Sequence, residues 1–246
     1  ASSDAAGNAV TSTGSASISV DTTADAGTVT VSTIAGDDII NASESGAATI
    51  AVSGTAMGGD IALGDTVTVS VNGTDYTTTV GAAGAYTVNV DTADLITDNS
   101  VAVSVASSDA AGNTVTSTGS STITVDTSAD AGTVTVNTIA GDDVINASES
   151  GAATIAVSGT ATGGDISVGD TVTVSVNGTD YTTTVGTGGA YTVNVTTSDL
   201  IADNSIDVSV LSSNLAGNTV TSTGSASITV DTSADAGTVT VNTIAG

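Results

Sequence analysis

Oxygen-bearing side chains crowd one short segment of this sequence, where they could bind a metal ion. The segment Gly36 to Glu44 reads Gly-Asp-Asp-Ile-Ile-Asn-Ala-Ser-Glu and recurs with one change at 141–149. A flexible set of roughly six to eight oxygen ligands favours Ca²⁺ over Mg²⁺. The alternative is a capped helical turn, in which Asp and Asn bind backbone N–H groups and Glu44 is merely exposed. Both interpretations stay open, because the segment lacks EF-hand spacing.

A second oxygen-rich group has the composition of a tight turn. Residues 108–113 read Ser-Asp-Ala-Ala-Gly-Asn, and the same six residues occupy 3–8. Residues 213–218 read Ser-Asn-Leu-Ala-Gly-Asn, so Asn214 stands where the other two copies have a carboxylate. The group is interpreted either as a turn alone or as a turn that also supplies cation ligands. Asn214 weakens such a site without abolishing it, because its amide still offers a carbonyl oxygen.

Pairs of aspartates recur in three connecting segments, at 21–25, 126–130 and 231–235. Like charges a few ångströms apart repel by about 1 kcal/mol or more at intermediate dielectric. The chain has no Lys, Arg or His to offset that repulsion, so a bound cation would relieve it. We therefore predict Ca²⁺ as the cofactor. The candidate ligands are Asp21, Asp25, Asp37, Asp38, Asn41, Glu44, Asp109, Asn113, Asp126, Asp130, Asp142, Asp143, Asn146, Glu149, Asn214, Asn218, Asp231 and Asp235.

The composition excludes several classes of function. The chain carries 26 acidic residues and a formal charge of −26. Without Lys or Arg it lacks the groups that neutralise phosphates, which excludes nucleic acid and anionic membrane surfaces as partners. His and Cys are absent too, so the usual general bases and activated nucleophiles are missing. We expect no enzyme, although a carboxylate-pair glycosidase is the one class that this composition still allows.

Strands must position these groups, because Val and Ile recur at every second position with Thr or Ser between them. In Thr66 to Val71, for example, the three valines share one face, which predicts one buried and one wet face. Gly and Asn separate such segments and accept the positive φ of tight turns. Tyr76 and Tyr86 alternate in phase with the valines, which favours packing in the core or across strands over a sugar-stacking platform. Asp94 and Asp98 flank a short helical turn, which they are expected either to cap or to join to a cation. Seven strands are expected, near 27–34, 48–54, 66–72, 75–80, 85–91, 100–107 and 113–126.

Seven antiparallel strands in about 100 residues predict an all-β immunoglobulin-like sandwich. Residues 26–130 recur as 131–235 with differences at 17 of 105 positions, so two such sandwiches follow in tandem in an elongated array. Residues 1–25 are expected to be the last strand of a preceding repeat, and 236–246 the first strand of a following one. Threading the strands up and down places the acidic loops and linkers at the ends of each sandwich.

The chain resembles a known family at four motifs: Val-Asp-Thr-Ser-Ala-Asp at 125–130, Asp-Asp-x-Ile-Asn-x-x-Glu at 37–44 and 142–149, Gly-Asp-Thr-Val-Thr-Val at 64–69, and Asp-Ala-Ala-Gly-Asn at 109–113. They resemble the bacterial immunoglobulin-like repeats of giant, type I secreted adhesins of the RTX class. The resemblance implies extender domains between a membrane-proximal anchor and an adhesive tip, with calcium stiffening their junctions. Implied calcium roles fall on Asp21, Asp25, Asp37, Asp38, Glu44, Asp109, Asp126, Asp130 and their equivalents one repeat further on. Many family linkers have Pro where this chain has Asp25 and Asp130.

The predicted function is that of a calcium-stiffened extender of a bacterial cell-surface adhesin or filament, outside the cell, in attachment or biofilm formation. Its expected partners are neighbouring repeats of the same chain, with lateral or end-to-end copies as further candidates and no membrane contact within this segment. The alternative is a repeated glycan-binding or homophilic adhesion module that acts by avidity. Exposed Thr and Ser faces without concave aromatic sites favour the extender.

Overall fold

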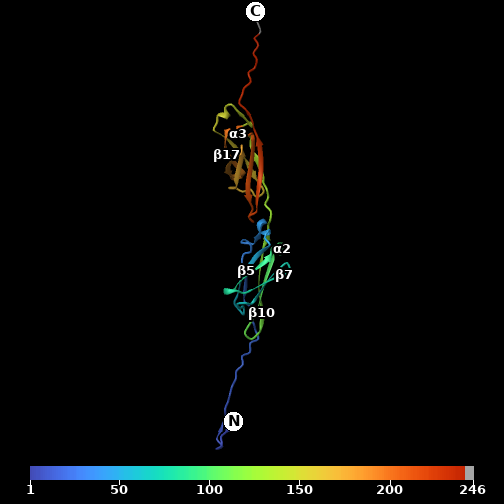
Figure 1. Ribbon diagram of the computed structural model, residues 1–246, viewed down its shortest axis with the longest axis vertical. Coiled ribbons are helices and arrows are strands. Elements are labelled where there is room, and N and C mark those ends of the chain that lie inside the picture. The colour runs from blue at the N-terminus through green and yellow to red at the C-terminus, as the bar shows by residue number, and fades with distance from the viewer. Residues whose placement is uncertain (242–246) are drawn as a thin grey trace, which may run out of the picture. The chain divides into compact units, whose positions relative to one another are not determined.

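The computed structural model describes residues 1–241, which form two compact units (Figure 1). Unit 1 comprises Ala1–Asp38 and Ala47–Thr124, and unit 2 comprises Ile39–Gly46 and the chain from Val125 onward. Each unit contains a three-stranded and a four-stranded antiparallel sheet, as expected of an immunoglobulin-like sandwich. None of the helices in the described chain is long and apolar enough to span a membrane.

Unit 1 is built from seven principal strands close to the predicted positions. One sheet has the order β3-β5-β8 and the other the order β10-β9-β6-β7. The short elements are the pair β1 and β2 near the N-terminus, the 3₁₀ turn η1 (Ala82–Gly84) and the helix α2 (Thr92–Thr97). The strands are β1 (Ser2–Ser3), β2 (Ala9–Val10), β3 (Thr28–Val31), β5 (Thr49–Met57), β6 (Thr66–Val71), β7 (Thr74–Thr79), β8 (Ala85–Asp91), β9 (Ser100–Ser108) and β10 (Thr114–Thr122).

Unit 2 repeats this arrangement. Its sheets have the orders β12-β14-β17 and β16-β15-β18-β19. The helical elements are α1 (Ala42–Ser45), η2 (Glu149–Gly151), η3 (Thr187–Gly189) and α3 (Thr197–Ala202). The strands are β12 (Thr133–Val136), β14 (Thr154–Thr162), β15 (Thr171–Val176), β16 (Thr179–Thr184), β17 (Ala190–Thr196), β18 (Ser205–Ser213) and β19 (Thr219–Ser227).

The last long strand of each repeat is shorter than the sequence predicts. β10 ends at Thr122, and the buried Ile123 then donates its N–H to the Asn99 carbonyl at 2.9 Å instead of continuing the ladder. In unit 2 the chain re-pairs after Ile228 as β20 (Thr229–Asp231), which runs parallel to β13 (Val144–Asn146). The equivalent short pair is β4 (Ile39–Ile40) with β11 (Thr124–Val125). The final strand therefore changes partner where it leaves the sandwich.

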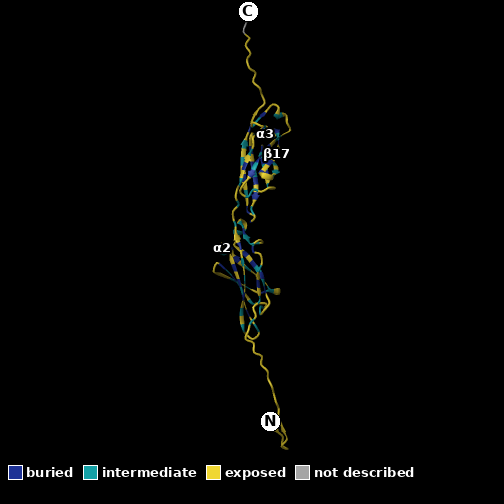
Figure 2. Cartoon of the chain, turned by 180° about the vertical axis from the view of Figure 1, so that it is seen from behind, coloured by how far each residue is buried: buried dark blue, intermediate teal, exposed yellow. Residues whose placement is uncertain are grey.

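The core of each unit consists of the inward faces of its strands, which Figure 2 shows as buried segments within exposed loops. In unit 1, β5 alternates buried and more exposed residues along its length, and the valines of β6 are fully buried on one face. In unit 2, one cluster joins Val174 and Val208 of one sheet to Val157 and Val195 of the other. The predicted alternation is confirmed, and small aliphatic side chains fill the space between the sheets.

The two predicted roles of tyrosine separate in the structure. Tyr86 is buried and donates its hydroxyl to the Thr30 carbonyl at 2.8 Å, so it ties β8 to β3 across the sheet. Gly54 makes room for this ring, since a Cβ at position 54 would lie 2.5 Å from the Tyr86 hydroxyl oxygen. Tyr76 on β7 is only half-buried and donates to Asp94 Oδ2 of α2 at 2.6 Å. Both tyrosines therefore hold neighbouring elements together.

Candidate functional site

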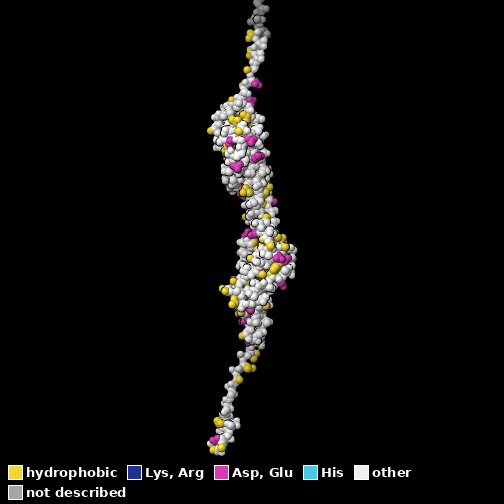
Figure 3. Space-filling view, in the orientation of Figure 1, with side chains coloured by type: hydrophobic (Ala, Val, Ile, Leu, Met, Phe, Trp, Pro, Cys, Tyr) yellow, Lys and Arg dark blue, Asp and Glu magenta, His cyan; other side chains and the backbone are white. Residues whose placement is uncertain are grey.

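An open recess of about 660 Å³ lies where the linker 126–130 meets the turns of unit 2. Three carboxylates line it: Asp126 and Asp130 from the linker, and Asp165 from the turn before β15. Neutral polar residues, among them Ser128 and Asn214, line the same surface. Figure 3 shows acidic side chains on the surface and no Lys or Arg, in agreement with the composition. The recess therefore holds three carboxylates and no positive side chain.

Hydrogen bonds from two turns of unit 2 position this linker. Asn218 Nδ2 donates to the Asp126 carbonyl at 2.8 Å, and Asn214 Nδ2 donates to Asp126 Oδ2 at 3.0 Å. The Asp130 N–H donates to Asp165 Oδ2 at 2.7 Å, and the Asp165 N–H returns a bond to the Asp130 carbonyl at 2.9 Å. The predicted ligands Asp126, Asp130, Asn214 and Asn218 are thus brought together in one place.

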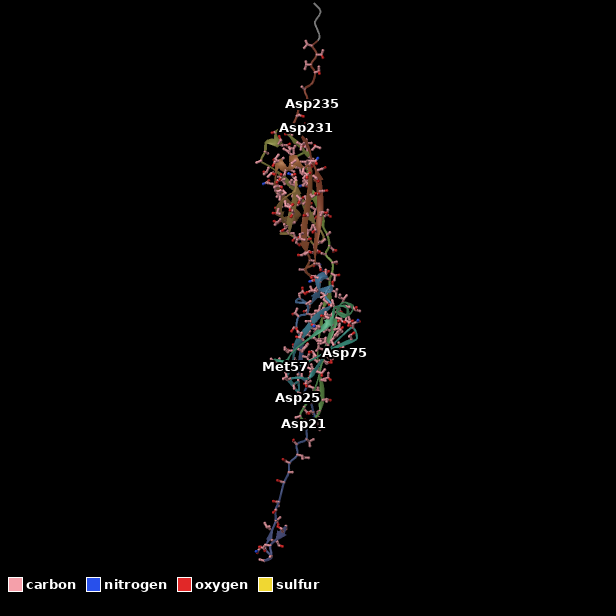
Figure 4. The ribbon with its side chains drawn as sticks, viewed as in Figure 1. Asp21, Asp25, Met57, Asp75, Asp231 and Asp235 are labelled. Carbon is pink, nitrogen blue, oxygen red and sulfur yellow. The ribbon has the colours of Figure 1, made fainter. Side chains whose placement is uncertain are left out.

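Unit 1 holds its incoming linker with equivalent residues. Asn113 Nδ2 donates to the Asp21 carbonyl at 3.1 Å, while Asp25 and Asp60 exchange backbone and side-chain bonds of 2.6 and 2.9 Å. Figure 4 labels Asp21 and Asp25 at the end of unit 1 that the N-terminal segment enters. Asp109 accepts from the Asn113 N–H and from its side-chain amide, and the latter bond is the main cause that lowers the pKa of Asp109.

Asp60 and Asp165 complete these sites, although neither was among the predicted ligands. Each follows a Gly-Gly pair in a turn that the up-and-down threading places at the linker end of the sandwich. Gly59 has φ of +54°, and a Cβ there would lie 2.3 Å from the Asp25 carbonyl oxygen. The Gly-Gly-Asp sequence, which lets the backbone approach the linker closely, was the signal that could have identified them.

The loop before α1 adopts the capped turn that the sequence left as an alternative. Asn41 Oδ1 accepts from the N–H groups of Ser43 and Glu44 at 2.9 and 3.1 Å, and Glu44 Oε2 accepts from the Asn41 N–H at 3.1 Å. Asn41 and Glu44 therefore form a capping box. Asn146 and Glu149 make the same reciprocal bonds one repeat further on, at 2.9 to 3.1 Å. Each Glu retains one carboxylate oxygen outside the box, so their role as ligands stays a prediction.

The aspartates that precede the caps also bind their own loops. Asp38 has φ of +62°, and its Oδ1 accepts the Ile34 N–H at 2.8 Å. Asp143 Oδ1 likewise accepts the Ile139 N–H at 2.7 Å. Asp142 Oδ1 accepts the Val144 N–H at 3.1 Å, and Asp37 is exposed. In unit 2, the N–H of Ala42 in α1 donates to Asn218 Oδ1 at 2.7 Å, which connects this loop to the linker site.

The remaining predicted ligands lie in the segment after β19. Asp231 Oδ1 accepts from the Ser233 N–H at 3.1 Å, and Asp235 is exposed. Asp231 is the last residue of β20, and Figure 4 labels both aspartates where the chain leaves unit 2. Within residues 1–241, no three acidic side chains approach closely enough to enclose a metal ion by themselves. A cation at either linker would therefore also need backbone carbonyl, amide or water oxygens, which suits the ligand chemistry of Ca²⁺.

Asp94 has a different role from the capping or ligation weighed for it. Its Oδ1 accepts from Asn72 Nδ2 at 3.0 Å and its Oδ2 from the Tyr76 hydroxyl, so it links α2 to the β6–β7 hairpin. The bond from Tyr76, followed by that from Asn72, lowers the pKa of Asp94 below its usual value. The same bond to Asp94 is the main cause that raises the pKa of Tyr76. This network is structural and lies outside the linker sites.

Comparison with solved structures identifies close likenesses over most of the chain. A Ca²⁺-stabilized adhesin that helps an Antarctic bacterium reach out and bind ice is 63% identical, with a TM-score of 0.81 over 96% of this chain and 57% of that one. A 1.5-MDa bacterial ice-binding adhesin studied for host cell surface retention is 55% identical, with a TM-score of 0.80 over 86% of this chain and 66% of that one. This chain therefore spans less than two thirds of either structure.

A single bacterial immunoglobulin-like domain from the M. primoryensis ice-binding adhesin is also 63% identical, over 42% of this chain and 100% of that one, with a TM-score of 0.41. No protein-family model and no curated protein matches the chain. The two longer matches, at 63% and 55% identity over most of this chain, settle the family. The chain belongs to the bacterial immunoglobulin-like extender repeats of giant RTX-type adhesins.

Proposed function

We propose that this chain is a calcium-stabilised length of stalk in a bacterial surface adhesin, and that it acts outside the cell as a spacer. The observation that carries the proposal is the linker site, which occurs once in each unit. In both units a linker with two aspartates is held against the same two turns, beside a further aspartate. We call each linker, together with the turns that hold it, a joint. A repeated joint of this kind suits a protein whose task depends on length and stiffness.

Calcium would act at these joints by replacing the missing cationic side chains. Asp126, Asp130 and Asp165 line one open recess, and the chain holds no positive side chain that could neutralise them. We assign the principal ligands to the linker aspartates and to the turns beside them. The capped loops at 37–44 and 142–149 form a second candidate site, in which ligation competes with the caps. A 63% identical adhesin is Ca²⁺-stabilized, which supports calcium as the ion, while the choice of ligands rests on the contacts described above.

The proposed partners are neighbouring repeats of the same polypeptide. We propose repeat boundaries at 26–130 and 131–235, because these ranges carry one linker each and differ at only 17 of 105 positions. Two near-copies with the same surface argue for a cumulative task and against catalysis, so we propose no enzymatic activity. Nucleic acid and anionic membranes are unsuitable partners, because a surface with a charge of −26 repels them.

Thermal unfolding of the whole chain in EDTA and in 10 mM CaCl₂ tests this proposal. If a joint binds calcium with a dissociation constant of about 0.1 mM, about 10 mM free calcium stabilises by roughly 2.7 kcal/mol per site. We expect a rise of many degrees in the melting temperature, and a smaller rise with 10 mM MgCl₂. Equal melting temperatures in EDTA and calcium would refute the proposal.

A matched pair of variants separates a specific site from general relief of charge. Asp130→Asn removes one charge from the recess, whereas Asp75→Asn removes one charge from the β6–β7 hairpin. Both changes conserve side-chain shape, and Figure 4 shows that Asp75 lies away from Asp21 and Asp25 in its own unit. We expect only Asp130→Asn to reduce the stabilisation by calcium. An equal reduction in both would mean that bulk charge, and no particular site, is responsible.

A further inference from the structure

The two linker sites differ at one residue that contacts the linker. Unit 1 has Asp109 in the turn between the last two long strands, and unit 2 has Asn214 at the equivalent position. The exchange of Asp for Asn leaves the backbone of the turn unchanged, because Oδ1 of either residue accepts the N–H of the Asn four positions later. Asp109 Oδ1 accepts the Asn113 N–H at 2.8 Å, and Asn214 Oδ1 accepts the Asn218 N–H at 3.0 Å. The difference lies in the second atom of the side chain.

At Asp109 this second atom is an acceptor, and it binds the neighbouring amide. Asp109 Oδ2 accepts from Asn113 Nδ2 at 2.7 Å, while the same Nδ2 lies 3.1 Å from the Asp21 carbonyl. One amide therefore serves both the turn and the linker. The third copy of the motif behaves alike, since Asp4 Oδ2 accepts from Asn8 Nδ2 at 2.9 Å. With Asp in the turn, the carboxylate brings a negative charge to the linker and offers it no donor.

At Asn214 the second atom is a donor, and it points to the linker. Asn214 Nδ2 donates to Asp126 Oδ2 at 3.0 Å and to the Ser128 carbonyl at 2.8 Å. The side-chain amide of Asn218 donates to the Asp126 carbonyl at 2.8 Å, while the Asn218 N–H stays bonded to Asn214 Oδ1. Asn218 is 6% exposed. Asp126 Oδ1 also accepts the Ser128 N–H at 3.2 Å. Each carboxylate oxygen of Asp126 thus has an N–H donor from the protein.

These contacts assign different requirements to the two linkers. A carboxylate that already has amide donors is stabilised without a counter-ion, since hydrogen bonds to the charged form offset its loss of water. We propose that Asn214 and Asn218 hold the 126–130 linker to unit 2 without a cation, whereas the Asp109 joint in unit 1 needs a cation to order its linker to the same degree. This inference rests on the proposed function for the unit 1 joint, and on hydrogen bonding alone for the unit 2 joint.

The consequence is a stalk whose joints respond differently to calcium. A single Asp-to-Asn exchange between near-identical repeats would set, joint by joint, the calcium concentration at which the linker becomes ordered. Joints with Asn would stay ordered when calcium is scarce, and joints with Asp would order only when it is abundant. Asn214 is in this sense a residue that determines the calcium dependence of its joint.

Amide hydrogen exchange, measured by NMR on the full chain, tests the inference at single residues. The N–H groups of Ser128 and Asp130 lie in the linker and are hydrogen-bonded to Asp126 Oδ1 and Asp165 Oδ2. In wild-type protein in EDTA we expect both to be protected, and calcium to change their exchange rates little. In Asn214→Asp in EDTA we expect exchange about tenfold faster or more, because two donated bonds are lost and a like charge faces Asp126.

Calcium should restore the protection in Asn214→Asp, and the reciprocal Asp109→Asn variant should gain protection of Asp25 N–H in EDTA. The fully buried Val174 amide of β15 serves as the control that reports global unfolding. Unchanged exchange of Ser128 and Asp130 in Asn214→Asp, or their complete loss of protection in wild-type EDTA samples, would overturn the inference. Failure of calcium to protect any variant, with the EDTA difference intact, would instead contradict the proposed function.

Discussion

Replacing Glu44 by Gln, and separately Asn41 by Ala, distinguishes a helix cap from a cation ligand in the loop before α1. In the structure Asn41 Oδ1 accepts two N–H groups of α1, and Glu44 Oε2 accepts the Asn41 N–H. The Glu44→Gln change keeps a carbonyl oxygen for that bond but removes the charge that would bind calcium. The Asn41→Ala change removes the cap acceptor altogether. The two changes therefore remove different properties of the same segment.

The magnitudes follow from these contacts. Loss of an N-cap acceptor typically costs about 1 kcal/mol, which corresponds to a fall in melting temperature of about 4–8 °C for a domain of about 60–100 residues. We expect Asn41→Ala together with Asn146→Ala to show this loss equally in EDTA and in calcium. Glu44→Gln together with Glu149→Gln should stay within about 0.5 kcal/mol of wild type in EDTA, because the reciprocal bond is retained.

Differential scanning calorimetry of both double variants, each in EDTA and in 10 mM CaCl₂, supplies the four comparisons. The capped geometry predicts that the stabilisation by calcium persists in the Glu-to-Gln variant. If that variant instead loses the calcium-dependent rise while its EDTA melting temperature is unchanged, Glu44 and Glu149 bind the ion through the oxygen that the cap leaves over. The reasoning from the cap would then be refuted.

Three further predictions concern the core, the acid side of the pH profile and the spacer function. Leu95→Ala or Leu200→Ala, at fully buried positions of α2 and α3, should each lower the free energy of unfolding by about 2–5 kcal/mol, as measured with urea. The control Gly46→Ala should be tolerated, because its Cβ would make only an ordinary contact at 3.5 Å. A loss in Gly46→Ala as large as in the Leu variants would contradict the packing. In the folded state the hydrogen bond from Tyr76 lowers the pKa of Asp94, and the bond from Tyr181 lowers that of Asp199. The two carboxylates therefore stabilise the fold above their unfolded pKa of about 3.9 and lose this effect as pH falls through the folded pKa. Asp94→Asn with Asp199→Asn should therefore flatten the loss of stability below about pH 4 in urea titrations, and an unaltered profile would exclude this network as a cause. Small-angle scattering of residues 26–235 should give a larger maximum dimension in calcium than in EDTA, because pinned linkers restrict swinging; a dimension independent of calcium with a flexible profile would count against the spacer.

The strand pattern could be predicted because it depends on neighbours in the chain. Alternation of Val with Thr, and Asn-Gly or Gly-rich turns between the alternating segments, placed all seven principal strands of unit 1 within a few residues of β3, β5, β6, β7, β8, β9 and β10. The short helix α2 was predicted from Leu95 and its flanking aspartates for the same reason. The break at Ile123 was missed, because the ladder ends where Asn99, 24 positions earlier, takes over as the hydrogen-bond partner.

Only some residues of the candidate site could be predicted from the sequence. The repeated linker aspartates and the turns that meet them were identified, since up-and-down threading decides which loops share an end of a sandwich. Asp60 and Asp165 were missed, because their partners lie 35 residues away and pairing at that separation depends on the Gly-Gly backbone. Whether the group from Asp37 to Glu44 makes a cap or a ligand set could not be decided either, because Asp and Asn side chains serve both purposes.

The sequence by itself determined that this protein is an all-β tandem repeat without Lys, Arg or His, because charge, periodicity and self-similarity are properties of the chain alone. Only the tertiary structure decided which oxygen atoms are already committed to backbone N–H groups and which face a linker. That distinction depends on distances between residues some 90 positions apart, such as Asn113 to Asp21 and Asn214 to Asp126. An exchange of Asp for Asn looks minor in the sequence, yet it reverses acceptor and donor at the atom that faces the linker.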